Sequence, residues 1–115
     1  MERYPISREE LKDMGIVYLN EVKRKLVGHY VSEISRETVE YARLGYTEFL
    51  YRVKYKETIP NIEDIVSQLQ QNFPGTNISP VIISTDYYEK ETYVIIDVSN
   101  ARYMDSINGI LLNWF

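Results

Sequence analysis

The repeat of apolar residues changes from a helical period to a strand period at Thr47, and this change decides the fold class. Between Leu11 and Ala42, apolar residues recur every three or four positions, which is the spacing of one face of a helix. From Thr47 to Lys56 they alternate with mostly polar residues, as in a strand with one face on a core and the other in water. Separate helical and strand stretches predict an α+β protein.

Two helical stretches are predicted before this strand. Ser7 and Glu10 have the spacing of a capping box, so we expect a helix over 7–27. Its apolar face consists of Leu11, Met14, Tyr18 or Leu19, Val22 and Leu26. Gly28 permits a break, and a second stretch over 31–44 ends at Gly45, although the two could form one bent rod.

The chain after the first strand is predicted to form a third helix and a hairpin. Asn61 and Asp64 resemble a capping box for a helix that carries Ile62, Ile65, Val66, Leu69 and Phe73 and ends at Pro74-Gly75. Two β-rich runs, 78–88 and 92–98, flank Glu89-Lys90-Glu91. The predicted fold is α+β, with helices on one face of a small antiparallel sheet in the order α-α-β-α-β-β, plus an apolar C-terminal segment.

That last segment has two readings. We predict a single domain over 1–115, in which 101–115 is either a tail that closes the core or a docking element. Met104, Ile107, Leu111 and Trp114 have helical spacing, but the run 110–112 also suits a short strand. The candidate partner-binding residues are the large apolar ones of this tail: Met104, Leu111, Trp114 and Phe115.

The residue types that usually carry catalysis or hold cofactors are scarce. The chain has no cysteine and one histidine, His29, which removes thiolate chemistry and a His-His metal pair within one subunit. Its five glycines are dispersed, so no glycine-rich phosphate loop is present. We therefore predict no enzymatic activity, no cofactor and no metal site. A small enzyme that uses carboxylates and a tyrosine, without a recognisable motif, remains an alternative.

The charge distribution bears on nucleic-acid binding. The net charge is −4, but residues 1–58 carry 11 basic against 10 acidic groups, and 59–115 carry 2 against 7. An acidic protein attracts phosphate only through a local patch. The alternative nucleic-acid-binding residues lie in the first half: Lys23, Arg24, Lys25, Arg52, Lys54 and Lys56. Strand alternation places Tyr51 and Val53 on the face opposite Arg52 and Lys54, which weakens this alternative.

Localisation is inferred from the ends of the chain and from its apolar runs. Residues 1–12 are polar almost throughout, and the longest apolar runs, such as 81–83, are far shorter than a membrane span. We expect an intracellular, cytoplasmic protein or a component of a virion, with no membrane span.

The runs Tyr41-Ala42-Arg43-Leu44-Gly45-Tyr46-Thr47, 62–75 and Ile95-Ile96-Asp97-Val98-Ser99 resemble small uncharacterised α+β proteins of large (nucleocytoplasmic) DNA viruses. The resemblance covers residues 34–99 and implies a structural or packaged component of the particle. The segment 101–115 departs from the pattern.

The function predicted from these observations is a non-enzymatic protein-interaction or structural module. Its partners are other protein subunits, including copies of itself. The 11 tyrosines support this prediction, because a tyrosine buries a large ring at an interface while its hydroxyl stays in water.

Overall fold

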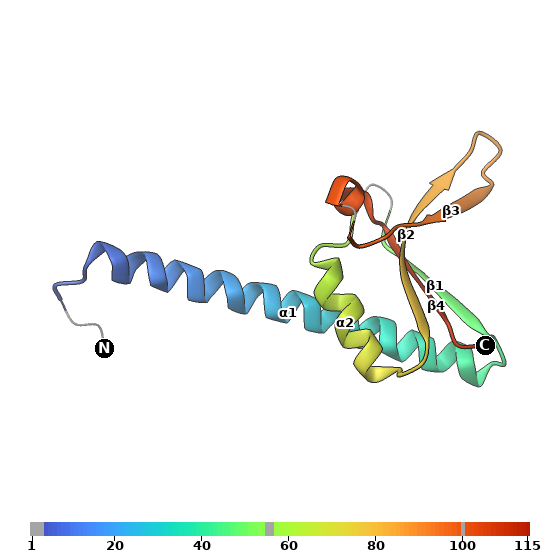
Figure 1. Cartoon of the computed structure of the whole chain (residues 1–115), viewed down its shortest axis with the longest axis horizontal. Coiled ribbons are helices and arrows are strands. Elements are labelled where there is room, and N and C mark those ends of the chain that lie inside the picture. Colours follow the sequence, from blue (N-terminus) through green and yellow to red (C-terminus); the bar gives the residue numbers. More distant parts are fainter. Residues whose placement is uncertain (1–3, 55–56, 100) are drawn as a thin grey trace.

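The computed structural model describes residues 4–54, 57–99 and 101–115. Its elements are α1 (Arg8–Arg43), β1 (Glu48–Arg52), α2 (Ile62–Asn72), β2 (Asn77–Thr85), β3 (Glu91–Ile95), the short 3₁₀ helix η1 (Ala101–Ser106) and β4 (Gly109–Asn113). The α+β class and the antiparallel sheet are confirmed (Figure 1). The predicted order is wrong in two places: the first two helices are one, and the C-terminal segment supplies a fourth strand.

One helix of 36 residues spans both predicted stretches, so the alternative of a single rod holds and the two separate helices of the predicted order do not. The Ser7 hydroxyl accepts a hydrogen bond from the Glu10 backbone N–H at 3.1 Å, which confirms the predicted start. Gly28 does not break the helix, because a helical glycine costs only about 1 kcal/mol and the turns on both sides continue the hydrogen-bond ladder. The helix ends where Gly45 adopts the left-handed backbone conformation.

The predicted capping box of α2 does not form. Asn61 stands at the N-cap position in the left-handed conformation and makes no side-chain capping hydrogen bond. The helix is held by its apolar face instead, since Ile62, Ile65 and Leu69 are fully buried.

The sheet has the order β1-β4-β2-β3, with each neighbouring pair antiparallel. The predicted hairpin of β2 and β3 is confirmed, but β4 lies between β1 and β2. On the face toward the helices, Leu112 stands between Phe49 and Ile78, and Ile110 stands between Tyr51 and Pro80.

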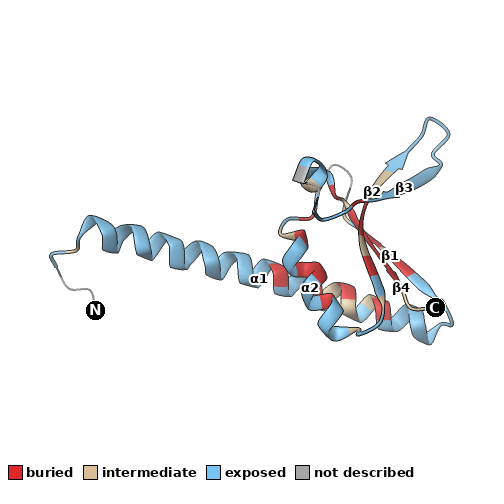
Figure 2. Cartoon of the chain, viewed as in Figure 1, coloured by how far each residue is buried: buried red, intermediate tan, exposed pale blue. Residues whose placement is uncertain are grey.

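These side chains form one hydrophobic core with the second half of α1 and with α2. Ile34, Ile65, Ile107, Ile110 and Leu112 are all fully buried. Figure 2 shows the buried residues gathered where α1, α2 and the sheet meet. The tail therefore closes the core, and of its two predicted roles the structure supports this one for 107–112.

Candidate protein-interaction surface

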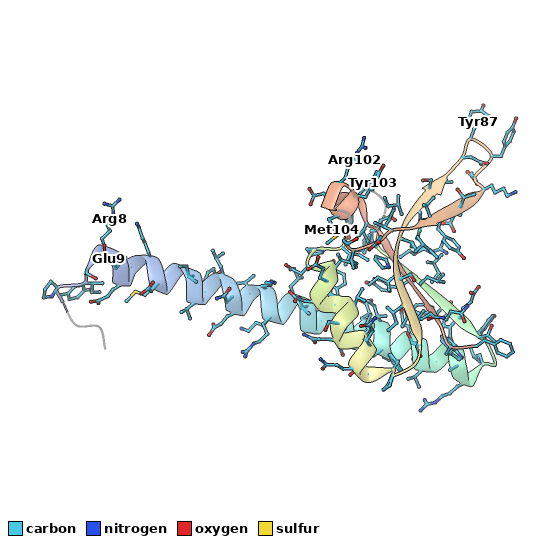
Figure 3. The ribbon with its side chains drawn as sticks, viewed as in Figure 1. Arg8, Glu9, Tyr87, Arg102, Tyr103 and Met104 are labelled. Carbon is cyan, nitrogen blue, oxygen red and sulfur yellow. The ribbon has the colours of Figure 1, made fainter. Side chains whose placement is uncertain are left out.

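The first half of α1 projects from the rest of the molecule (Figure 1). Every residue from Arg8 to Leu26 is exposed, and the first buried position of the helix is Val27. We call Arg8–Leu26 the arm. It gives the molecule a longest dimension of 60 Å, against 33 and 24 Å in the other directions. Figure 3 shows Arg8 and Glu9 at the far end of the arm.

The arm carries an apolar face that nothing in the described chain covers. We call it the arm stripe, and its side chains are Leu11, Met14, Tyr18, Leu19, Val22 and Leu26. Each is more than a third exposed, and Tyr18 and Leu19 are about two-thirds exposed. A run of large apolar side chains in water is unusual for a soluble domain and marks an interaction site.

The arm stripe is not a continuation of the core-facing side of the helix. At about 100° per residue, the stripe residues centre on a direction nearly opposite to that of Val27, Val31, Ile34 and Thr38. Those four are the residues of α1 that are buried against the rest of the fold. The stripe therefore faces away from α2. Ile16 and Val17 are also exposed, outside the stripe.

Charge changes sign along the arm. Its first two turns contain three acidic residues, Glu9, Glu10 and Asp13, against two basic ones. Its last two turns contain Lys23-Arg24-Lys25 against one acidic residue. Lys23 also pairs with Asp64 of α2 at 3.0 Å, and both side chains are about half exposed.

At its inner end the arm stripe meets a groove of about 600 Å³ between α1 and β1. Leu26 belongs to both the stripe and the groove, and Glu33, Glu37 and Glu57 add negative charge to the groove lining. Positive charge comes from Lys54 at the same opening. The apolar arm stripe thus leads into a polar groove whose lining carries charges of both signs.

Tyr51 is the buried polar residue of this groove. Its hydroxyl donates to Glu33 Oε2 at 3.3 Å, and its ring meets the edge of Tyr30 with the centroids 6.4 Å apart. Burial, followed by the negative charge of Glu33, raises the pKa of Tyr51 well above its ordinary value of 10. Burial also raises the pKa of Tyr30, with smaller contributions from Glu57 and Glu33. Both phenols therefore stay protonated at neutral pH, and that of Tyr51 donates its proton to the hydrogen bond with Glu33.

His29 lies at the rim of the same groove. Its Nε2 is 3.9 Å from Glu33 Oε2, and its side chain is three-quarters exposed. Within the described residues, no cluster of three or more histidines and carboxylates is arranged to hold a metal ion.

The four tail residues predicted to bind a partner are not presented together. Leu111 is buried, and Met104 and Trp114 are partly buried against the core. Figure 3 places Met104 on η1, whereas Trp114 follows β4 at the other end of that strand. Phe115 is 97% exposed. A shared docking surface made of these four residues is therefore not what the fold builds.

The six cations of the nucleic-acid alternative are also separated. Lys23, Arg24 and Lys25 lie on the arm, whereas Arg52 faces the sheet surface opposite the helices and pairs with Glu91 of β3. Lys54 follows β1, and Lys56 lies outside the described residues. Lys23 and Arg52 thus each have a carboxylate partner, and no single basic patch forms from the five described residues.

Sequence reasoning identified the stripe residues as the apolar face of a helix and placed the helices on one face of the sheet, without separating the arm from the part of the helix that packs. The signal that could have separated them is the phase of the pattern. Between Leu26 and Val27 the apolar positions jump to the other side of the helix, so one core cannot receive both faces.

No protein-family model matches the chain, and no curated protein or solved structure compared with it matches either. In the part of the chain that the structure describes, α1 is long enough to cross a membrane but too polar to do so.

Proposed function

We propose that this chain is a non-enzymatic protein-interaction module, and that the arm stripe is its contact surface. The observation that carries the proposal is the exposure of six large apolar side chains on one face of a helix that projects from the core. Burying a leucine-sized side chain contributes about 1.5–3 kcal/mol, so this face gains much from a partner.

The arm itself also favours this role. Most helical stability in proteins comes from packing an apolar face against the rest of the fold. The arm has 19 residues without packing of its own. A partner on the stripe supplies that packing and orders the arm.

The resemblance to α+β proteins of large DNA viruses adds a setting to the proposal, namely a structural role within a particle. The interaction itself is argued from the arm alone and does not depend on that setting.

The test is site-specific photo-crosslinking in the cells that naturally make the protein. A photoreactive residue is placed at Tyr18, on the stripe, and as a control at Asn20, which is exposed on the opposite side of the same helix. We expect a protein adduct of defined mass from position 18 and none from position 20. Equal labelling at both positions, or no protein adduct from position 18, would refute the proposed function.

A further inference from the structure

We propose that the groove between α1 and β1 binds an extended, basic peptide segment of another protein, which adds a strand to the open edge of β1. This inference goes beyond the proposed function, because it concerns a second surface and does not depend on the arm stripe.

β1 is an edge strand, and one row of its backbone groups is free to pair. Within the described sheet it pairs with β4 alone. Val53, directly after β1, donates its N–H to the Asn108 carbonyl before β4 at 3.1 Å. The backbone groups of an antiparallel strand point alternately to its two sides, so those of Leu50 and Arg52 point away from β4. They are available to a further strand.

The groove runs along this open edge. Its lining includes every residue from Phe49 to Lys54, although neighbouring side chains of a strand lie on opposite faces. Only the edge of a strand adjoins both faces. The other wall of the groove is one face of α1, from Leu26 to Tyr41. Its volume of about 600 Å³ is typical of a binding cleft, and an unpaired strand edge is what an extended peptide pairs with.

The charges of the lining favour a basic segment. α1 contributes Glu33 and Glu37, and the loop after β1 contributes Glu57. Among the described residues, none of these three carboxylates forms an ion pair with a lysine or an arginine. The side chain of Arg52 does not offset them, because it is paired with Glu91 on the opposite face of the sheet. The carboxylates thus outnumber Lys54, the remaining cation of the lining.

Aromatic rings stand beside these carboxylates. Tyr41 and Phe49 have their ring centroids 4.6 Å apart, and Tyr30 and Tyr51 have theirs 6.4 Å apart. All four line the groove. A lysine or arginine side chain buries its apolar stem on such rings and is attracted to their faces, while its charged end reaches a carboxylate.

The two faces of the added strand meet different surroundings. Side chains on one face point toward α1 and its carboxylates, whereas those on the other face lie beside the surface where Arg52 and Glu91 are already paired. The expected partner therefore carries lysine or arginine at every second position and uncharged residues between them.

The first experiment measures binding of a peptide to the purified full chain by fluorescence anisotropy. The probe is a short, labelled peptide with blocked ends in which lysine alternates with threonine. We expect saturable binding in the micromolar range, and none when glutamate replaces every lysine. Absence of binding by the lysine peptide, or equal binding by both peptides, overturns the proposal.

The second experiment removes the backbone donor of the edge. Leu50→Pro deletes the outward N–H and leaves the bonds to β4 in place, because proline is tolerated on the open side of an edge strand. We expect it to weaken binding about tenfold or more, whereas Leu50→Val, which keeps the N–H, binds as the wild type does. Equal binding by the two variants overturns the proposal.

A change in the peptide tests the same hydrogen bonds without altering the protein. N-methyl groups are placed either on all lysine amides or on all threonine amides. Only one of these two sets of N–H groups points at β1 in an added strand, so we expect one methylated peptide to lose binding and the other to retain it. Equal effects of the two modifications exclude strand addition.

The outer edge of β3 provides a control for location. Tyr93 has its N–H on the open side of β3, because Ile96, three positions on, donates to the Pro80 carbonyl next to β2. The hairpin of β2 and β3 extends away from both helices (Figure 1). We expect Tyr93→Pro to leave binding unchanged. A loss as large as that of Leu50→Pro would show that the peptide does not select the groove.

The last experiment separates the groove from the net charge of the chain. Glu37→Gln removes a carboxylate of the lining, whereas Glu40→Gln makes the same change on α1 outside it. We expect Glu37→Gln to weaken binding about two- to fivefold and Glu40→Gln to have little effect. Equal losses overturn the charge argument. Failure in the peptide assays leaves the proposed function intact if position 18 still crosslinks a protein in cells, and peptide binding without that adduct has the opposite meaning.

Discussion

At the scale of single residues, Tyr51 connects the sheet to α1 through a side chain that is polar and 7% exposed. Its hydroxyl binds Glu33, whereas its ring packs in the core cluster. Burying a hydroxyl without a hydrogen-bond partner costs free energy. The hydrogen bond to Glu33 therefore allows a tyrosine to occupy this core position.

The raised pKa of Tyr51 makes the stability of the fold depend on pH in the alkaline range. The folded chain keeps the phenol proton at pH values where the unfolded chain, with a tyrosine pKa near 10, has released it. The contribution is complete below pH 10 and is lost as the pH rises above it. We expect the free energy of unfolding of the wild type to fall above pH 10, and to fall less steeply for Tyr51→Phe.

Urea titrations of both proteins at pH 8 and at several values above pH 10 measure this difference. At pH 8 the loss of the hydroxyl costs Tyr51→Phe about 0.5–1.5 kcal/mol. Tyr18→Phe, on the exposed arm, is the control and keeps the wild-type dependence. Parallel alkaline curves for wild type and Tyr51→Phe would contradict the argument.

Gly109 is the residue at which a side chain is least tolerated. A Cβ there would lie 2.7 Å from Ile83 Cδ1, 2.8 Å from the Tyr51 carbonyl oxygen and 3.0 Å from Val81 Cγ2. The Tyr51 carbonyl belongs to the backbone of β1 and cannot shift as easily as the end of a side chain. We therefore expect Gly109→Ala to destabilise the fold by about 1–3 kcal/mol.

Gly28 provides the matched control for this substitution. A Cβ at Gly28 meets nothing within 4 Å, and the residue lies inside α1. Gly28→Ala should therefore stabilise the chain by up to about 1 kcal/mol. Thermal unfolding of both variants measures the two effects, and a stable Gly109→Ala variant would show that β4 can shift to make room.

At the scale of elements, the two ends of the chain make opposite contributions to folding. The arm adds nothing to the core, whereas β4 is hydrogen-bonded on both sides, to β1 and to β2. Asn108 extends the second pairing, since its side-chain amide donates to the Ile83 carbonyl at 3.0 Å and accepts from the Ile83 N–H at 2.7 Å. One of the two inner strands of the sheet, β4, is thus formed by residues 109–113.

Truncation from each end should separate these contributions. A chain that starts at Arg24 should fold with a free energy of unfolding within about 1 kcal/mol of the full chain, because exposed positions contribute little and Lys23–Asp64 is a surface pair. A chain that ends at Ser99 should not fold, because it lacks Ile107, Ile110 and Leu112.

Near-ultraviolet circular dichroism and urea unfolding measure both truncations. A cooperative transition in the chain that ends at Ser99 would show that β1 and β2 can pair without β4. Loss of the transition in the chain that starts at Arg24 would show that the arm contributes to folding.

At the scale of the whole molecule, the arm decides the shape. The radius of gyration is 18.1 Å, whereas a compact chain of this length has one of about 13 Å. The hairpin of β2 and β3 is a second extension, with Tyr87 almost fully exposed at its tip (Figure 3).

The sequence alone predicted the α+β class, the start and end of the helical region, the apolar face of α2 and the hairpin of β2 and β3. Each depends on residues close together in the chain: a period of apolar positions, a cap such as Ser7, or a stop such as Gly45. The break that Gly28 permits does not occur, and the predicted side-chain cap at Asn61 was wrong, because the rest of a helix can override one unfavourable or missing local contact.

Only the tertiary structure shows which surface each apolar face packs against, because the local sequence pattern carries no information about distant parts of the chain. The sequence pattern shows that Leu111, Trp114 and the arm stripe form apolar faces, but it does not show whether other parts of the chain cover them. The insertion of β4 between β1 and β2 buries residues 109–112 of the tail, for which the sequence left both a core-closing and a docking role open. The same core takes the Val27 side of α1 and leaves the opposite side of the arm in water, because one helix has two sides and this fold fills only one.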